Sequence, residues 1–257
     1  KDAFQLAVYS IVGEQELVSS MLSGALKASG DVSVSEKLLL GCNVICLLAN
    51  RDEKNAEVVS DKTPSVMIDV LEWSLDNPNH VDDVGDAAMQ AIIDMMSCNE
   101  GSIEAFSTDS SCRILSRYLS YFDNTEIQVI NDSVGYRNCM EVIWVLCTDS
   151  AENRVSFSRT AVHISLAEYW RKLMLQKADP LISPVPSLRV ERAVLSAIRY
   201  LCTDCPENKT KCAELNVADG VLLYINIIFI DNKIEKVVSN SDSHDVVMDD
   251  LEELIVE

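Results

Sequence analysis

The chain has 257 residues, of which 48% are hydrophobic, and it contains only 8 glycines and 6 prolines. Enough apolar surface is available to bury a core, which excludes a chain disordered throughout, and the scarcity of glycine and proline disfavours folds with many tight turns. The net charge of −20 is concentrated in residues 1–128, whereas residues 129–240 are balanced and residues 241–257 lack lysine and arginine; because an acidic surface repels phosphate backbones, nucleic-acid binding is disfavoured.

The first residues of the chain are predicted to form helices. The chain begins with Lys1 rather than methionine, in a run typical of a helix, so we interpret it as part of a longer protein. Two helices are predicted over residues 2–12 and 14–28. At one end of an array of helices, such a pair would cover the first repeat and present its own polar side to water.

From residue 35 onward, three kinds of helix alternate, and together they predict an all-α fold. Helices that are apolar nearly all round, as expected when neighbours cover several sides, are predicted at 38–49, 87–96, 139–147 and 193–202. Short helices follow at 53–60, 100–107, 151–158 and 206–214. Longer amphipathic helices are predicted at 64–74, 110–121, 161–177 and 216–230. Loops are expected at 123–138 and at 178–187, the second because its three prolines are incompatible with a helix.

Four segments of this pattern are related in sequence. They read ICLLANRDEKN, IIDMMSCNEGS, IWVLCTDSAEN and IRYLCTDCPEN, and they end at Asn55, Ser102, Asn153 and Asn208. Each places a polar corner directly after an apolar helix. Side chains of Asn, Asp, Ser and Thr in such a corner can cap the next helix, and Pro206 is suited to a first helical turn. The spacing of about 50 residues is typical of helical repeat arrays.

These segments share one order of features: an apolar helix, a leucine, a small residue, a polar corner and Glu-Asn. In this order the chain resembles the armadillo-repeat family over roughly residues 35–230. The resemblance implies a right-handed α-solenoid of about four armadillo-like repeats with capping helices, spanning residues 1–240, whose groove holds other proteins. Importin-α-like and catenin-like members grip an extended peptide with an asparagine on each groove-lining helix. Here those positions carry Leu47, Asp94, Val145 and Tyr200. The resemblance therefore predicts docking of a folded partner, a helix or a second copy.

The candidate partner-binding residues lie on the helices that would line this groove. They are Asp94, Glu141, Trp144, Arg192, Arg199 and Tyr200. Arg192 and Arg199 are seven residues apart and share one helix face, and arginine and tyrosine are enriched at interface hot spots. A basic partner residue would meet Asp94, with a hydrogen-bonded structural role as the alternative. Trp144 belongs to a helix covered on several sides, so core packing is the alternative for it. Trp170 is also typical of a core, with partial exposure near a helix end as the alternative.

No residues are arranged in a pattern typical of catalysis. His80, His163 and His244 are far apart in the sequence, and the chain has no glycine-rich phosphate loop, GxSxG or HExxH motif. We therefore predict no enzymatic activity, no cofactor and no metal. Most of the nine cysteines lie in apolar runs, which favours buried free thiols. Cys202 and Cys205 are spaced as in a zinc or redox half-site, but a zinc site needs four ligands, so packing is the favoured interpretation.

The sequence predicts a protein-interaction scaffold or adaptor that binds a partner, such as a helix or a basic segment, without inserting into a membrane. Residues 241–257 are predicted to be an acidic tail or capping helix. Free thiols favour a cytoplasmic location, with nuclear, cytoskeletal or ciliary association as alternatives. Two other functions stay open. One is a non-enzymatic regulator of a chaperone or small GTPase, similar to exchange-factor-like armadillo proteins; the other is a self-assembling homo-oligomeric component of the cytoskeleton or cilium.

Overall fold

The structure, a computed structural model, describes residues 16–27, 32–49, 63–98, 100–178 and 188–224, and these contain helices and no strand, which confirms the all-α prediction. The main helices are α2 (Glu16–Lys27), α3 (Val32–Ala49), α5 (Thr63–Asp76), α6 (Asp86–Cys98), α7 (Glu100–Phe106), α8 (Asp109–Tyr121), α9 (Ile127–Asp132), α10 (Val134–Thr148), α11 (Ala151–Ser158), α12 (Val162–Ala178), α13 (Leu188–Cys202) and α14 (Pro206–Glu214). Residues 217–224 are also helical. Within these ranges, no helix has the length and apolar character that crossing a bilayer requires.

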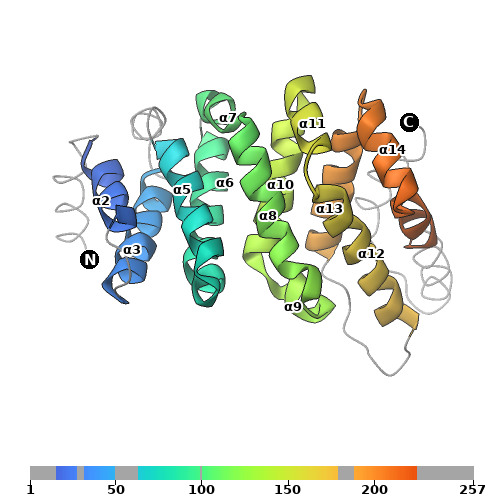
Figure 1. Cartoon of the computed structure of the whole chain (residues 1–257), viewed down its shortest axis with the longest axis horizontal. Helices are drawn as coiled ribbons and strands as arrows, with labels where there is room; N and C mark the ends of the chain where they lie inside the picture. Colours follow the sequence, from blue (N-terminus) through green and yellow to red (C-terminus); the bar gives the residue numbers. More distant parts are fainter. Residues whose placement is uncertain (1–15, 28–31, 50–62, 99, 179–187, 225–257) are drawn as a thin grey trace, which may run out of the picture.

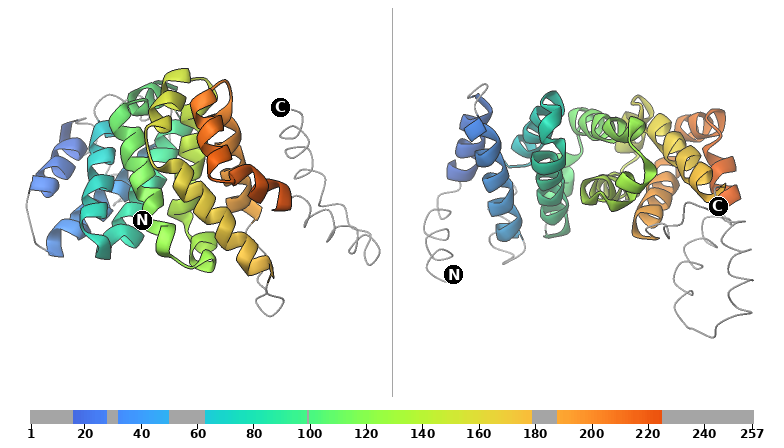
Figure 2. Two further views of the ribbon diagram at one scale, coloured as in Figure 1. Left: turned by 45° about the vertical axis from the view of Figure 1, so that its right-hand side comes forward. Right: turned by 90° about the horizontal axis from the view of Figure 1, so that it is seen from below.

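The helices follow one another along the long axis of the molecule in chain order (Figures 1 and 2). The apolar helices α3, α6, α10 and α13 pack side by side in that order, and α5, α8 and α12 form a second row beside them. In Figure 1, α8 and α12 lie in front of α10 and α13. Helices α11 and α14 pack against each other at the corners between the rows.

The predicted ends of the apolar helices agree with the structure to within two residues, but α3, α10 and α13 begin five or six residues earlier than predicted, and the loop expected at 123–138 is wrong. A 3-10 turn (Phe122–Asn124), helix α9 and the first residues of α10 occupy it. Ser133 caps α10 by accepting a hydrogen bond from the Tyr136 amide, so this helix begins five residues before the predicted Cys139. A π-helical turn (Val81–Gly85) likewise precedes α6. The helices predicted at 2–12 and 53–60, the acidic tail or capping helix at 241–257, and residues 179–187 of the second predicted loop lie outside the described residues.

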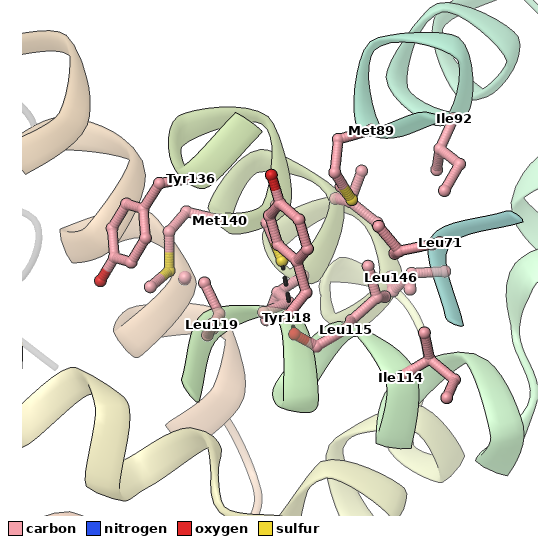
Figure 3. Packing of buried hydrophobic residues seen from close by; sticks show 14 of the residues in the cluster. Leu71, Met89, Ile92, Ile114, Leu115, Tyr118, Leu119, Tyr136, Met140 and Leu146 are labelled. Carbon is pink, nitrogen blue, oxygen red and sulfur yellow. Dashed lines mark hydrogen bonds between the residues drawn. The ribbon is translucent and has the colours of Figure 1, made fainter. Parts of the chain in front are cut away.

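The core is a continuous layer of aliphatic, methionine and aromatic side chains between the two rows. Figure 3 shows side chains of α5, α6, α8 and α10 meeting there, with the Cys139 thiol donating to the Leu115 carbonyl over 3.6 Å. Rings in edge or stacked contact continue the layer toward α12 and the last described helix: Tyr118, Phe122, Tyr136, Tyr169, Trp170 and Tyr224. Each such pair adds about 1 kcal/mol beyond its burial.

The asparagine that ends the repeated motif is buried and fixes the corner. The amide of Asn153 donates to the Leu146 carbonyl over 2.8 Å and to Ser107 Oγ over 2.9 Å. The amide of Asn208 donates to the Leu201 carbonyl over 2.7 Å and to the Arg154 carbonyl over 2.8 Å. In both repeats the side chain therefore bonds the carbonyl seven residues earlier, at the end of an apolar helix, and also reaches the preceding repeat. It satisfies carbonyls that the helix itself leaves unpaired.

Arg154 and Trp170 are both buried. Arg154 is 8% exposed, and its guanidinium donates to the Cys147 carbonyl over 2.6 Å. A cation at this place stabilises the carboxyl end of α10. Trp170 is 1% exposed because Tyr169 and Tyr224 cover its ring, so the partial exposure considered for it is wrong.

Three helices meet at a buried polar junction. Asp86, at the start of α6, accepts a hydrogen bond from the Tyr118 hydroxyl of α8 over 2.5 Å and another from the Gly135 amide of α10. Burial raises the pKa of Asp86, and these two hydrogen bonds oppose the shift. Gly135 has no side chain where Asp86 and Tyr118 approach its backbone, so the junction depends on glycine at this position.

A buried histidine makes the stability of the fold depend on pH. His163 is 1% exposed, and its Nε2 lies 2.8 Å from Asn208 Oδ1. Because the Asn208 amide group donates to two carbonyls, its oxygen accepts, so His163 donates from Nε2. Burial lowers the pKa of His163, and the nearby Lys211 lowers it further. The folded state therefore binds this proton less readily than the unfolded chain does.

We expect the melting temperature to fall as the pH drops below about 6.5, the ordinary pKa of histidine in the unfolded chain. The loss grows until the pH reaches the lowered pKa of the folded state, and it is absent above the unfolded value. Thermal melts of the wild type and of His163→Gln between pH 8 and pH 5 would measure it. Other groups titrate identically in both proteins, so the difference between the two curves isolates His163. Parallel curves would contradict the assignment.

Candidate functional site

The exposed sides of the apolar helices form one surface, which we call the four-helix face. Helices α5 and α8 cover the opposite sides of α6 and α10, so the remaining side chains of these helices point away from the second row. On α3 this face carries Leu40 and Leu47, which are 52% and 53% exposed. Its other members lie on α6, α10 and α13: Gln90, Asp94, Arg137, Glu141, Trp144, Arg192, Arg199 and Tyr200.

An aromatic pair lies on this face where α10 packs against α13. The rings of Trp144 and Tyr200 stack, with their centroids 6.1 Å apart and their planes at 23°. The guanidinium carbon of Arg199 lies 5.4 Å from the centre of the Tyr200 ring. All three side chains are half-buried. The core packing considered for Trp144 is therefore incomplete, because one part of its ring contacts Tyr200 and another stays accessible. The arrangement offers a flat, amphipathic platform with a positive charge at its edge.

A chain of polar contacts joins α6 to α10 beside the aromatic pair. The Gln90 amide donates to Asp94 over 2.8 Å, and the Asn138 amide donates to the Gln90 oxygen over 2.9 Å. On the other side of Asp94 lies Cys46 of α3; burial and the Asp94 carboxylate raise the pKa of this thiol to about 12. Asp94 is thus hydrogen-bonded within the face: it contacts Cys46 of α3 directly and is linked to α10 through Gln90.

Glu141 lies between this polar chain and the aromatic pair. Its carboxylate forms an ion pair with Arg137 over 3.7 Å, one turn earlier on α10. Trp144 follows one turn later, and residues three or four apart are neighbours on a helix surface. The structure therefore brings Trp144, Tyr200 and Arg199 into contact, with Glu141 one turn before Trp144 on α10 and Asp94 on the neighbouring helix α6.

Arg192 is the sixth predicted residue, and it lies two turns before Arg199 along α13. It is exposed, whereas Arg199 is half-buried. The prediction missed Gln90, Arg137 and Asn138, since a polar side chain in an apolar helix gives no sign of its partner on another helix. Leu40 could have been found from the sequence because it lies seven residues before Leu47, on the same side of α3.

The eight cysteines whose side chains the structure describes show no arrangement suited to metal binding. Cys202 contacts Cys212, with 3.7 Å between the sulfur atoms, whereas Cys205 donates to Glu207. The hydrogen bond with Cys212 lowers the pKa of Cys202, and burial opposes the shift. Among the described residues, no three His, Cys, Asp or Glu side chains are close enough to hold a metal ion. The eight cysteines that the structure describes are free thiols, six of them buried.

No protein-family model matches this chain, and neither a curated protein nor a solved structure matches it.

Proposed function

We propose that this chain is a protein-interaction scaffold or adaptor that binds a partner protein on the four-helix face. The stack of Trp144 on Tyr200, with Arg199 at its edge, carries the proposal. Tryptophan, tyrosine and arginine are the side chains that most often dominate the binding energy of an interface. A half-buried pair is held in place by its neighbours, so little conformational entropy is lost when a partner covers it.

We further propose that the two rows of helices form a right-handed solenoid of the armadillo type. The equivalent hydrogen bonds of Asn153 and Asn208 support it, because each spans seven residues at the same place in its repeat. The order of packing supports it as well, since α3, α6, α10 and α13 occupy equivalent positions in succession. In such an array the apolar helices line a continuous surface that is longer than any single helix.

The partner segment that fits this face best is an amphipathic helix. The face offers separate apolar contacts on different helices: Leu40 and Leu47 on α3, and the aromatic pair on α10 and α13. Contacts spaced in this way suit the apolar residues that recur along one side of a partner helix. Positive charge at Arg192 and Arg199 favours an acidic residue next to the anchor over the aromatic pair. Asp94 already accepts a hydrogen bond from Gln90, so we assign it to positioning α6 and α10.

Replacing Trp144 by alanine is expected to weaken partner binding by at least about 30-fold, as for other buried aromatic anchors. The partner would be captured from the native source with the tagged wild-type chain and then purified, and its dissociation constant measured by calorimetry. Leu175→Ala is the matched control, because this leucine is 60% exposed on α12, in the other row. It should leave the dissociation constant unchanged.

Equal weakening by the two substitutions would contradict the assignment of the four-helix face. A captured protein that binds wild type and Trp144→Ala equally well would contradict it too. If the captured protein is another copy of this chain, light scattering of wild type and variant decides whether the face serves self-assembly. The buried free thiols support a reducing compartment, and we propose the cytoplasm.

A further inference from the structure

A pocket of about 460 Å³ lies on the side of α8 that faces α11 and the beginning of α12. It is formed by α8, α11 and the turn that leads into α12, and it shares no residue with the four-helix face. Basic and hydroxyl side chains line much of it, among them Arg113, Arg117, Arg159, Ser116 and Thr160, with one carboxylate, Asp109. Its volume is within the range of sites that bind small molecules.

Two of the three arginines in this pocket have no acidic partner within the described ranges. Arg117 is paired with Asp76 over 2.6 Å and with Glu72 over 3.6 Å, both outside the pocket. In the part of the chain that the structure describes, Arg113 and Arg159 form no ion pair or hydrogen bond through their side chains. This is unusual in a chain with 41 acidic and 21 basic residues, in which carboxylates are abundant. The pocket therefore holds positive charge that the protein does not neutralise.

Asp109, the one carboxylate that lines the pocket, forms no ion pair with Arg113 in the described part of the chain. It lies one turn before Arg113 on α8, a spacing that allows an ion pair. Its carboxylate instead accepts a hydrogen bond from Ser156 of α11. This contact joins the two helices at the edge of the pocket and leaves the Arg113 guanidinium available to a ligand.

Ser116 gives independent evidence for a ligand. It lines the pocket and is 2% exposed, yet its hydroxyl has no hydrogen-bond partner among the described residues. A serine inside a helix usually donates to a carbonyl of the preceding turn, as Ser120 does to the Ser116 carbonyl over 3.1 Å. A buried hydroxyl without a partner destabilises a protein, and an acceptor brought by a ligand would remove that cost.

We propose that this pocket binds a phosphate monoester, with Arg113, Arg159 and the Ser116 hydroxyl as donors to the phosphoryl oxygens. A phosphoryl group has three terminal oxygens and a charge between about −1.5 and −2 at neutral pH, which matches two unpaired guanidinium groups and a hydroxyl. A carboxylate carries a single charge and would neutralise only one of the two guanidinium groups. Arginine forms paired hydrogen bonds to phosphate, so the ligand would be oriented as well as held.

Titration of the whole 257-residue chain with O-phosphoserine tests the proposal, followed by calorimetry and by the NMR signals of the arginine side chains. We expect saturable binding of phosphoserine and none of serine. Arg113→Gln and Arg159→Gln should each weaken binding by about tenfold or more, because each removes a charge-assisted hydrogen bond. Arg171→Gln is the control, since Arg171 is paired with Glu168 over 2.5 Å and lies outside the pocket.

Ser116→Ala separates a ligand-binding role from a structural one. It should weaken phosphoserine binding several-fold while leaving the melting temperature of the unliganded chain unchanged or higher. A lower melting temperature would mean that the hydroxyl already has a partner and would overturn its role. Absence of saturable binding, or equal weakening by Arg171→Gln and Arg113→Gln, would overturn the site itself.

Comparing a phosphoserine peptide with free phosphoserine in the same titration distinguishes two sources of the phosphoryl group. Tighter binding of the peptide indicates a phosphorylated protein as the source, and tighter binding of free phosphoserine indicates a small metabolite. In either outcome the ligand is a phosphate monoester.

Discussion

Replacing Gly135 by alanine is expected to destabilise the protein by about 3 kcal/mol, although alanine is the better helix former. A Cβ atom at this position of α10 would lie 2.0 Å from Asp86 Oδ1 and 2.1 Å from the Tyr118 hydroxyl. Either the hydrogen bond between these two side chains breaks or α10 moves away from α6 and α8. Urea unfolding followed by circular dichroism would measure the loss.

Gly24→Ala is the matched control for this substitution. Gly24 also lies inside a helix, α2, but a Cβ atom there would meet nothing within 4 Å. Alanine at this position should stabilise the protein by about 0.5–1 kcal/mol, because the unfolded chain loses freedom. If both variants changed stability in the same direction and by a similar amount, the three-helix junction around Gly135 would not be the cause.

Replacing Asn208 by alanine is expected to lower the free energy of unfolding by about 3 kcal/mol as well. The substitution leaves the Leu201 and Arg154 carbonyls and the His163 Nε2–H group without their partner in a buried place. Each buried polar group left unpaired costs about 1 kcal/mol or more. The same variant should also change the pH dependence of stability, because the environment of His163 changes with it.

The equivalent substitution in the preceding repeat, Asn153→Ala, should cost less, about 2 kcal/mol. One partner of Asn153 is the hydroxyl of Ser107, which also donates to the Ile103 carbonyl and so keeps a hydrogen bond. Asn43→Ala is the neutral control, because this asparagine is exposed on α3. Equal stability of the Asn208 and Asn43 variants would mean that the corner asparagine has no structural role.

Several features of the fold could be predicted from the sequence because they depend on neighbours in the chain. The repeated segments placed the ends of α10 and α13 at the observed corners, and Ser150 caps α11 as its residue type suggests. Pro206 occupies the first turn of α14. Capping and proline geometry involve residues only a few positions apart, so the local sequence is sufficient to predict them.

The environment of individual side chains could not be predicted in the same way. Trp144 and Trp170 both lie in helices rich in apolar residues, yet Trp170 is buried under Tyr224 and Trp144 is half exposed beside Tyr200. Periodicity shows which side of a helix is apolar, but the helix that covers that side comes from a distant part of the chain. The early start of α10, in contrast, has a local cause, because Ser133 caps its first turn by accepting a hydrogen bond from the Tyr136 amide.

The sequence by itself determined that this protein is helical, that its helices alternate in three kinds and that related corners join them. Only the tertiary structure decided which polar groups are satisfied: the corner asparagines bond two repeats at once, Arg154 is buried, and the Ser116 hydroxyl and two guanidinium groups share one pocket without partners among the described residues. Helix formation is set by nearby residues, whereas the hydrogen bonds and ion pairs of side chains depend on contacts between segments that the sequence separates by about 50 positions.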